Sequence, residues 1–204
     1  DIWRAQADAY IRLEEPVSAA ACLETLRRLG RAEARTLLFL GDIYVNENLP
    51  ELAQARYLQA LNEGALPEAA QALRAGRALA RLGEWPLLHD YLTRLKEAYT
   101  GRLTPAQRND LAVLDAQAAL GLGDDAGAVA MLEDVVRRDP LHGRALLLLA
   151  GHYARAGEPA RAAMLYERAT QVDETQVEAL IRHARMLAER GDYAGAVPLL
   201  RRAQ

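Results

Sequence analysis

The side chains that could carry out acid–base or nucleophilic chemistry are scattered along this 204-residue sequence. Cys22 is the single cysteine, which excludes an internal disulfide and a cysteine metal cluster. No serine or cysteine lies near a histidine that an acid could orient, and the four histidines lack metal-ligand spacing. Acidic pairs such as Asp124 and Asp125 fall in expected turns, where water would surround them. The sequence therefore predicts a protein that is not an enzyme and uses no cofactor or metal.

Arginine is the residue type whose spacing does suggest binding chemistry. Arg74, Arg77 and Arg81 are three and four residues apart, which places them on one face of a helix. Guanidinium groups bind carboxylates and other anions, although a solvated face with local ion pairs is the alternative interpretation. The formal net charge of −3 and the pI of about 5.9 argue against general nucleic-acid binding. We therefore expect an acidic ligand and no nucleic acid.

The composition, 51% hydrophobic and 26% charged, is that of a globular chain. The longest apolar run, residues 145–150, is far shorter than the roughly 20 residues that cross a bilayer. The first ten residues do not form a basic and then apolar targeting segment. We expect a soluble chain without membrane insertion. The preference for arginine over lysine suggests bacterial coding, and the compartment, bacterial cytoplasm or periplasm, stays open.

The elements that must position these residues repeat about every 34 residues. A column of small residues has successive spacings of 34, 35, 40, 34 and 34: Ala7, Gly41, Gly76, Ala116, Ala150 and Ala184. A bulky column follows in each unit: Leu23, Tyr57, Leu92, Leu132, Tyr166 and Leu200. Within each unit apolar residues recur three and four apart in two blocks, which predicts two amphipathic helices joined by a turn.

The turns and the longer fourth unit have recognisable end signals. Four glycines are expected to end first helices in the left-handed conformation: Gly83, Gly123, Gly157 and Gly191. Pro86 and Pro159 then fit the start of a second helix. In the unit with the 40-residue spacing, Thr104, Pro105 and Gln107 predict an N-cap, a first helical residue and a capping-box partner. We therefore expect the first helix of this unit to begin about one turn early.

These columns resemble the tetratricopeptide repeat family over essentially the whole chain. The matching residues are Trp3, Leu40, Gly41, Tyr44, Ala53, Tyr57, Ala60, Pro140, Gly157, Ala162, Tyr166 and Ala169. The resemblance implies an all-α fold, a right-handed α-solenoid of six helix-turn-helix units with a longer first helix in unit four. The expected units are about 1–33, 34–68, 69–108, 109–142, 143–176 and 177–204 of a single superhelix. Leu88 departs from the family, which prefers alanine there. Because both ends lack a polar capping face, we expect a fragment of a longer protein.

The resemblance implies that the first helices line a concave groove that binds a partner. The residues beside the packing columns are expected to face it: Leu38, Phe39, Asp42, Arg74, Arg77, Arg81, Val113, Leu114, Gln117, Leu147, Leu148, Gly151, Arg155, Arg182 and Arg185. Phe39 and the central valine and leucines would form an apolar lining, and Gly151 would leave room for a side chain. Packing between repeats is the alternative for the leucines. Neighbouring positions of the same helix faces add Arg4, Arg12, Arg35, Arg144, Asp1, Asp8, Asp110, Glu178 and Glu189. The resulting ten arginines and six acids predict a groove charge near +4.

Four consecutive leucines make this expectation specific. Leu146 and Leu149 fall in packing columns, whereas Leu147 and Leu148 fall in groove columns. The four leucines are therefore expected to lie on two faces of one helix, a core face and a binding face. Outside the groove, Cys22 is expected to be a buried small hydrophobe.

Three functions are compatible with this sequence. We favour a non-enzymatic scaffold that binds a peptide or helix of another protein, with apolar and acidic residues, in the groove. The first alternative is the periplasmic repeat region of an exopolysaccharide-export or other envelope assembly system, with an anionic polymer as a further ligand. The second is the regulatory arm of a larger enzyme or signalling protein. The family's clamp for chaperone C-termini is not reproduced, because Asp8 would repel a carboxylate.

Overall fold

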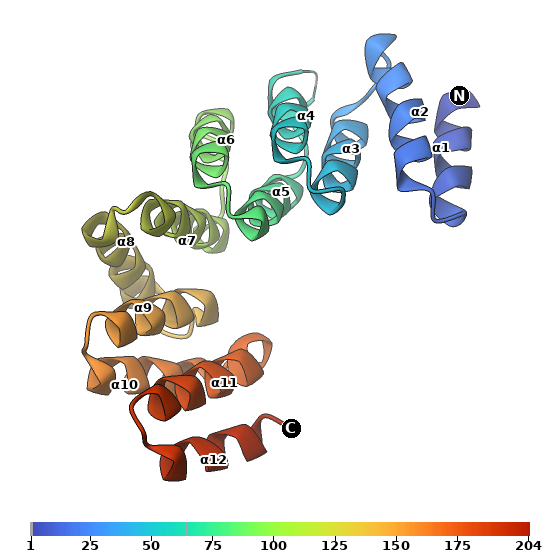
Figure 1. Ribbon diagram of the computed structural model, residues 1–204. Helices are drawn as coiled ribbons and strands as arrows, with labels where there is room; N and C mark the ends of the chain where they lie inside the picture. Colours follow the sequence, from blue (N-terminus) through green and yellow to red (C-terminus); the bar gives the residue numbers. More distant parts are fainter. Residues whose placement is uncertain (1, 64) are drawn as a thin grey trace. The chain divides into compact units, whose positions relative to one another are not determined.

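The computed structural model describes residues 2–63 and 65–204, which form twelve α-helices and no strand (Figure 1). The prediction of an all-α fold of helix-turn-helix units is confirmed. The helices are α1 (Ile2–Arg12), α2 (Pro16–Arg28), α3 (Ala34–Asn46), α4 (Pro50–Asn62), α5 (Ala69–Leu82), α6 (Trp85–Ala98), α7 (Pro105–Leu122), α8 (Asp125–Arg138), α9 (Gly143–Arg155), α10 (Pro159–Ala169), α11 (Asp173–Glu189) and α12 (Tyr193–Arg202).

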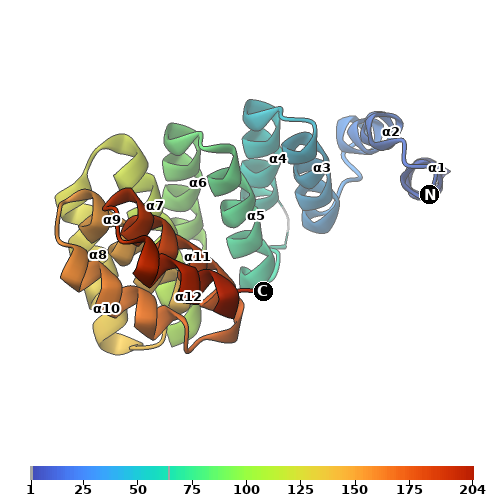
Figure 2. The same cartoon turned by 60° about the horizontal axis from the view of Figure 1, so that its bottom comes forward.

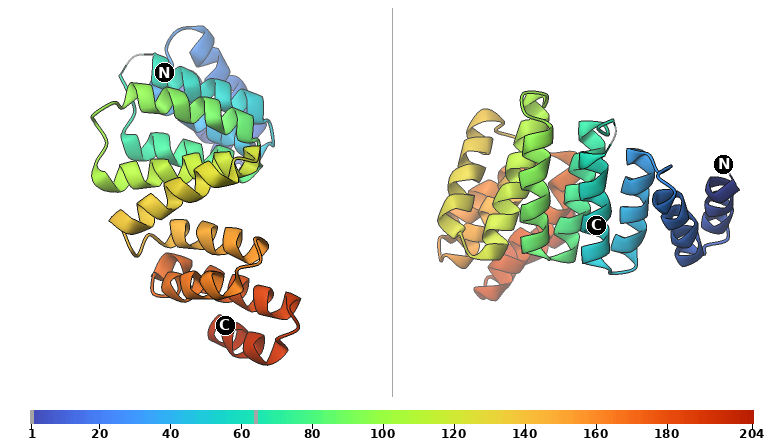
Figure 3. Two further views of the ribbon diagram at one scale, coloured as in Figure 1. Left: turned by 90° about the vertical axis from the view of Figure 1, so that its left-hand side faces the viewer. Right: turned by 90° about the horizontal axis from the view of Figure 1, so that it is seen from above.

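The chain divides into two compact units, Asp1–Leu122 and Gly123–Gln204. The division falls inside the predicted fourth repeat, between its two helices. In the N-terminal unit α3 packs on α5, α5 on α7 and α4 on α6, and Figure 2 shows α3 to α6 side by side. In the C-terminal unit, drawn from yellow to red in Figure 3, α9 packs on α10 and on α11, and α11 packs on α12. The first helices α3, α5 and α7 therefore lie next to one another in the N-terminal unit, as do α9 and α11 in the C-terminal unit, whereas α1 packs on α2. The single superhelix over 1–204 stays a prediction.

The predicted helix ends are present in the structure. Gly83 ends α5 with a φ of 76°, and the other three predicted glycines also have positive φ. Glycine adopts this conformation without the steric penalty of a Cβ, so it stops a helix cheaply. Pro86 and Pro159 lie in the first turns of α6 and α10, where a missing N–H costs nothing.

Helix α7 has 18 residues and begins with the predicted capping box. The Thr104 amide donates to Gln107 Oε1 at 2.9 Å, and the Gln107 amide donates to Thr104 Oγ1 at 3.2 Å. Two N–H groups that a helix start leaves unpaired are thereby satisfied. Pro105 is the first helical residue, so the prediction of a longer first helix in this repeat is confirmed.

The small and bulky columns pack directly against each other. A Cβ on Gly41 would collide with the ring of Tyr57, which is fully buried and lies 5.9 Å from the Tyr91 ring. The glycine therefore lets the two helices of a repeat approach across an aromatic side chain. Cys22 is buried, as predicted. None of the helices in the described part of the chain combines the length and the apolar character that crossing a bilayer requires.

Candidate binding cavities

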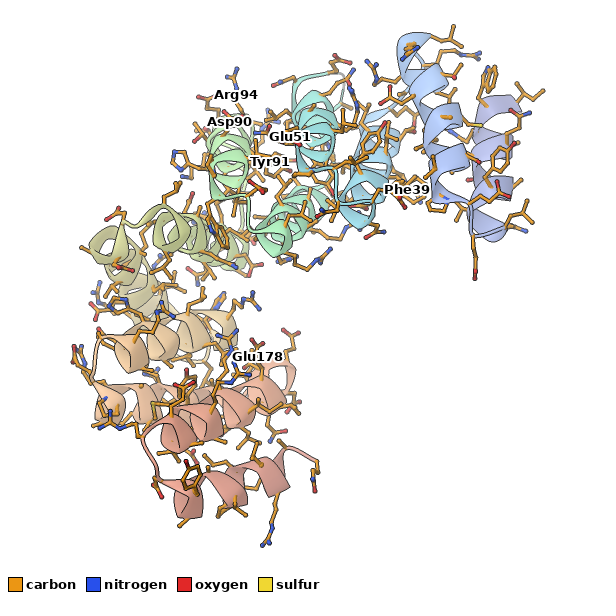
Figure 4. All side chains as sticks on the ribbon, in the orientation of Figure 1. Phe39, Glu51, Asp90, Tyr91, Arg94 and Glu178 are labelled. Carbon is orange, nitrogen blue, oxygen red and sulfur yellow. The ribbon has the colours of Figure 1, made fainter. Side chains whose placement is uncertain are left out.

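A cavity of about 730 Å³ lies among α1, α2, α3 and α5 in the N-terminal unit. We call it the N-terminal cavity, and its lining consists of Arg4, Asp8, Leu23, Glu33, Arg35, Thr36, Leu38, Phe39, Asp42, Gln71 and Arg74. Phe39, on α3, is 39% exposed (Figure 4). Leu38 is buried and contributes only to the wall. Most predicted groove residues of the first three repeats therefore do line one hollow.

A chain of polar contacts runs from the core to this cavity. The Tyr57 hydroxyl donates to Asp42 Oδ1 at 2.8 Å, and Asp42 Oδ2 pairs with Arg74 Nη2 at 2.8 Å. Burial, followed by the charge of Asp42, raises the pKa of Tyr57, so the phenol stays a protonated donor. Asp42 therefore satisfies both a buried hydroxyl and a guanidinium group.

A second cavity, of about 810 Å³, opens between α9 and α11 in the C-terminal unit. We call it the C-terminal cavity, and it is lined by Gly151, Ala154, Arg155, Tyr166, Glu174, Val177, Glu178, Ile181, Arg182, Arg185, Met186 and Glu189. Glu178, on α11, pairs with Arg182 at 2.6 Å (Figure 4). Val177 and Ile181 are 50% and 40% exposed. This cavity therefore combines apolar and charged surface.

The two cavities do not have the excess of arginine over acidic residues that is expected for the groove. Each lining contains three arginines and three acidic residues. Glu33 comes just before α3 and Glu174 lies in the first turn of α11, so a reading of mid-helix columns omits both. The two linings are consequently balanced in formal charge, and any selectivity for an anion must come from local arrangement.

The arginines on α5 make local ion pairs. Arg74 pairs with Asp42 at 2.8 Å, and Arg77 Nη1 lies 3.6 Å from Asp110 Oδ2. Arg81 is exposed in the last turn of α5, away from the lining of the N-terminal cavity. The structure thus agrees with the alternative of a solvated face with local pairing for Arg74 and Arg77. Such exposed pairs contribute little to stability.

The predicted apolar lining of the central repeats is largely buried, which corrects the exposure expected for it. Val113, Leu114 and Leu147 are at most 4% exposed. The reason is the side-by-side packing of first helices: a Cβ on Gly76 of α5 would lie 3.3 Å from Leu114 Cδ1 of α7. The adjacent first helix therefore covers the face that the columns assign to the groove.

The leucine run and Gln117 complete the predicted set. Leu146, Leu147 and Leu149 are buried, and only Leu148 is half-buried. The expected division of the run into two pairs is therefore wrong for Leu147, which belongs to the core. Gln117 is half-buried on α7. Gly151, Arg155, Arg182 and Arg185 all line the C-terminal cavity.

Sequence reasoning missed Tyr166 as a cavity residue. It was assigned to the bulky packing column, and it is indeed only 4% exposed, but it also lines the C-terminal cavity. The available signal was a tyrosine in a column where most repeats have leucine. His183 stacks on the Tyr166 ring at 5.7 Å, and burial lowers the pKa of His183. Within the described residues no group of histidine, cysteine and acidic side chains is arranged to hold a metal.

Comparison with known proteins agrees with this fold. The model of the tetratricopeptide repeat family matches residues 114–177 and 155–204. Cellulose synthase 2 operon protein C of Komagataeibacter xylinus is 32% identical over 182 residues, which cover 81% of this chain and 14% of that protein. The chain thus spans only a small part of this relative's length.

Solved structures of low sequence identity share the fold. PilW, a type IV pilus biogenesis factor, has a TM-score of 0.66 and 20% identity, over 97% of this chain and 89% of its own. PilF of Pseudomonas aeruginosa has a TM-score of 0.63 and 18% identity, over 98% and 87%. A repeat-containing protein of Cytophaga hutchinsonii has a TM-score of 0.64 and 17% identity, over 98% and 81%. Together with the paired helices and the family match, they lead to one conclusion: the chain belongs to the tetratricopeptide repeat family.

Proposed function

We propose that this chain is a non-enzymatic scaffold that binds a peptide or helix of a partner protein on the face of its first helices. The observation that carries the proposal is Phe39, an aromatic side chain that is 39% exposed on the lining of a cavity of about 730 Å³. Concave surfaces with an exposed apolar anchor among polar groups are typical binding sites. An amphipathic helix or extended peptide could place an apolar side chain against this ring.

The charges around Phe39 limit what the partner can bring. Arg74 is already paired with Asp42, and Arg4 lies 3.8 Å from Glu33. A strongly acidic segment would meet the negative charge of Asp42 and Glu33 at the N-terminal cavity, so we expect an apolar contact to dominate there. An acidic anchor, if the partner has one, needs arginines elsewhere in the chain.

The test uses peptides selected from a phage-displayed library on the wild-type chain. Phe39→Asp should weaken their binding at least about tenfold, because aromatic anchors carry much of the affinity of such surfaces. Leu52→Asp is the matched control, since Leu52 is 41% exposed on α4 and is not part of the cavity lining. Equal losses in both variants, or no loss in Phe39→Asp, would contradict the proposal.

A second candidate function follows from the similarity to cellulose synthase 2 operon protein C of Komagataeibacter xylinus. In this version the chain is a repeat segment of a protein that serves exopolysaccharide assembly in a bacterial envelope. The 32% identity over 182 residues supports it. A photoreactive residue in place of Phe39, used in the native organism, would separate the two: cross-links to a protein support the scaffold, whereas cross-links to polysaccharide support direct polymer binding.

A further inference from the structure

Two positions of the N-terminal cavity, and a buried tyrosine that contacts one of them, recur in the lining of the C-terminal cavity with one decisive change. Asp42 directly follows the small-column residue Gly41, and Gly151 directly follows the corresponding Ala150. Tyr57 and Tyr166 share the bulky column of their repeats. Finally, Arg74 and Arg182 each lie two residues before the small residue of the next repeat, Gly76 and Ala184. The two units thus have the same tyrosine and arginine, but only one has the carboxylate.

In the N-terminal unit the carboxylate connects the other two groups. Asp42 accepts a hydrogen bond from Tyr57 and pairs with Arg74, both at 2.8 Å. In the C-terminal unit the side chain at this position is missing. A Cβ on Gly151 would lie 3.7 Å from Arg155 Nη1, 3.9 Å from Tyr166 Oη and 4.0 Å from Arg182 Nη1. Three donor groups therefore converge on a position that the chain itself leaves empty of side-chain atoms.

Tyr166 shows that this arrangement is incomplete. Its side chain is 4% exposed and lines the cavity. Among the described residues its hydroxyl has no hydrogen-bond partner, whereas the Tyr44, Tyr57, Tyr91 and Tyr153 hydroxyls each have one. The hydroxyl oxygen is not among the fully buried side-chain atoms that lack a hydrogen-bond partner, so it is accessible from the cavity. A phenol without a partner at the edge of a cavity is consequently a donor available to a ligand.

We propose that the C-terminal cavity binds the carboxylate of an aspartate or glutamate of the partner peptide, held by Tyr166, Arg155 and Arg182 above Gly151. The ligand's carboxylate takes the place that the Asp42 side chain has in the N-terminal unit. The proposal deepens the scaffold function and rests on it. It also supplies the acidic anchor site that the N-terminal cavity lacks.

The charges around the site favour one incoming carboxylate. Arg182 already pairs with Glu178, but Arg155 and Arg185 make no ion pair within the described residues. Arg155, Arg182 and Arg185 all lie close enough to influence the Tyr166 hydroxyl, with Glu189 as the single acid that does so. An arginine can bind two carboxylates through different N–H groups, so the Glu178 pair does not block Arg182.

The surroundings favour a peptide over an acidic sugar as the source of the carboxylate. Val177 and Ile181, about half and two-fifths exposed, lie in the same lining. Apolar side chains that flank an acidic residue in a peptide would contact them, whereas a hydroxylated sugar would gain less from their burial. The peptide Ac-Leu-Glu-Leu-NH₂ is therefore a suitable minimal probe.

The experiment titrates this peptide, its glutamine counterpart Ac-Leu-Gln-Leu-NH₂ and glucuronate into the ¹⁵N-labelled chain. The glutamate peptide should shift the amide resonances of Gly151, Arg155 and Arg182 and bind at least about tenfold more tightly than the glutamine peptide, because charge-assisted hydrogen bonds are stronger than neutral ones. Equal binding of the two peptides would overturn the carboxylate site. Tighter binding of glucuronate than of the glutamate peptide would overturn the peptide as occupant and favour an acidic polymer.

Variants test the geometry. Gly151→Asp should abolish the shifts because the added carboxylate occupies the site, and Tyr166→Phe should weaken binding about fivefold. Unchanged binding in Gly151→Asp would overturn the proposal.

The reverse change can be made in the N-terminal unit. Asp42→Gly should create carboxylate binding at Arg74, and adding Tyr57→Phe should reduce this binding. If Asp42→Gly does not fold, the C-terminal variants still decide. Phe39→Asp lies in the other unit and reports on the scaffold function alone, so the two failures can be told apart.

Discussion

Tyr57 and Tyr166 occupy the same column of their repeats, and their surroundings show how one fold can make either a structural contact or an open site. Tyr57 donates to Asp42, which in turn holds Arg74. Tyr166 lies next to Arg182 and Arg155, but Gly151 provides no acceptor. The backbone is helical in both places. The difference therefore lies in a single side chain rather than in the architecture.

Another tyrosine contact is conserved between the two units and provides a reference. Tyr44 donates to Glu24 at 3.0 Å, and Tyr153 donates to Glu133 at 2.7 Å, with the same separation of 20 residues in the chain. These pairs join the second helix of one repeat to the first helix of the next. The columns of the repeat thus preserve contacts between neighbouring helices while the side chains at the cavity positions change.

The largest effect is expected from changing one buried leucine in each unit. Leu38 and Leu147 share a column and are 2% and 1% exposed. Leu147→Asp should destabilise the C-terminal unit by more than about 4 kcal/mol, because a charge is buried without a partner. Amide hydrogen exchange should show protection lost in α9 and α10 and retained in α3 and α4, with the reverse for Leu38→Asp.

Leu148→Asp is the control for this prediction. Leu148 is half-buried next to Leu147 in α9, so a charge at this position keeps access to water and should cost much less. Similar loss of protection in both variants would mean that the helix face between the buried leucines is as closely packed as the core.

A smaller effect is expected from removing the internal carboxylate. Asp42→Ala leaves the Tyr57 hydroxyl buried without an acceptor, which should destabilise the N-terminal unit by about 1–3 kcal/mol in chemical denaturation. Glu51→Ala, at an exposed position of α4, is the control and should change stability by less than about 0.5 kcal/mol. If Asp42→Ala is as stable as the control, the Tyr57–Asp42–Arg74 chain is not what distinguishes this unit.

The repeat and most helix ends were predictable from sequence because they depend on local rules. Glycine at positive φ, proline in a first turn and the Thr104–Gln107 capping box each act within a few residues. Burial along the first helices was not predictable in the same way. Whether Leu114 faces solvent depends on how closely the next helix approaches, and that distance is set by Gly76 on another helix.

The candidate site was predictable in its members but not in its chemistry. The columns placed Asp42, Arg74, Gly151 and Arg182 on the face that forms the cavities. They did not show that Glu33 and Glu174 complete the linings. Both residues lie at the start of a helix, and the columns describe only positions in the middle of the helices. They also assigned Tyr166 to packing alone, since a hydrophobic pattern describes where a ring lies and says nothing about where its hydroxyl points.

Supplying the missing carboxylate should convert the C-terminal cavity into a copy of the N-terminal one. Gly151→Asp fits without a clash, because a Cβ there meets nothing closer than 3.7 Å. A double-mutant cycle with Tyr166→Phe should give a coupling energy of about 0.5–1.5 kcal/mol, the usual value of a hydrogen bond. The cycle cancels the gain in helix propensity that any replacement of glycine brings. Zero coupling would show that the two units differ in more than this side chain.

The smallest effect is the pH dependence that one histidine should give the C-terminal unit. His183 occupies the column that holds Leu40 in the N-terminal unit, and burial together with Arg202 lowers its pKa from the ordinary 6.5, although Glu167 opposes the shift. The unfolded chain therefore binds the proton more readily than the folded chain. The C-terminal unit has its full stability with respect to His183 above pH 6.5 and loses stability as the pH falls toward the lower folded-state pKa. His183→Leu should remove this slope from denaturation curves of the C-terminal unit. If the stability of the variant still depends on pH in this range, other groups cause the dependence and His183 does not.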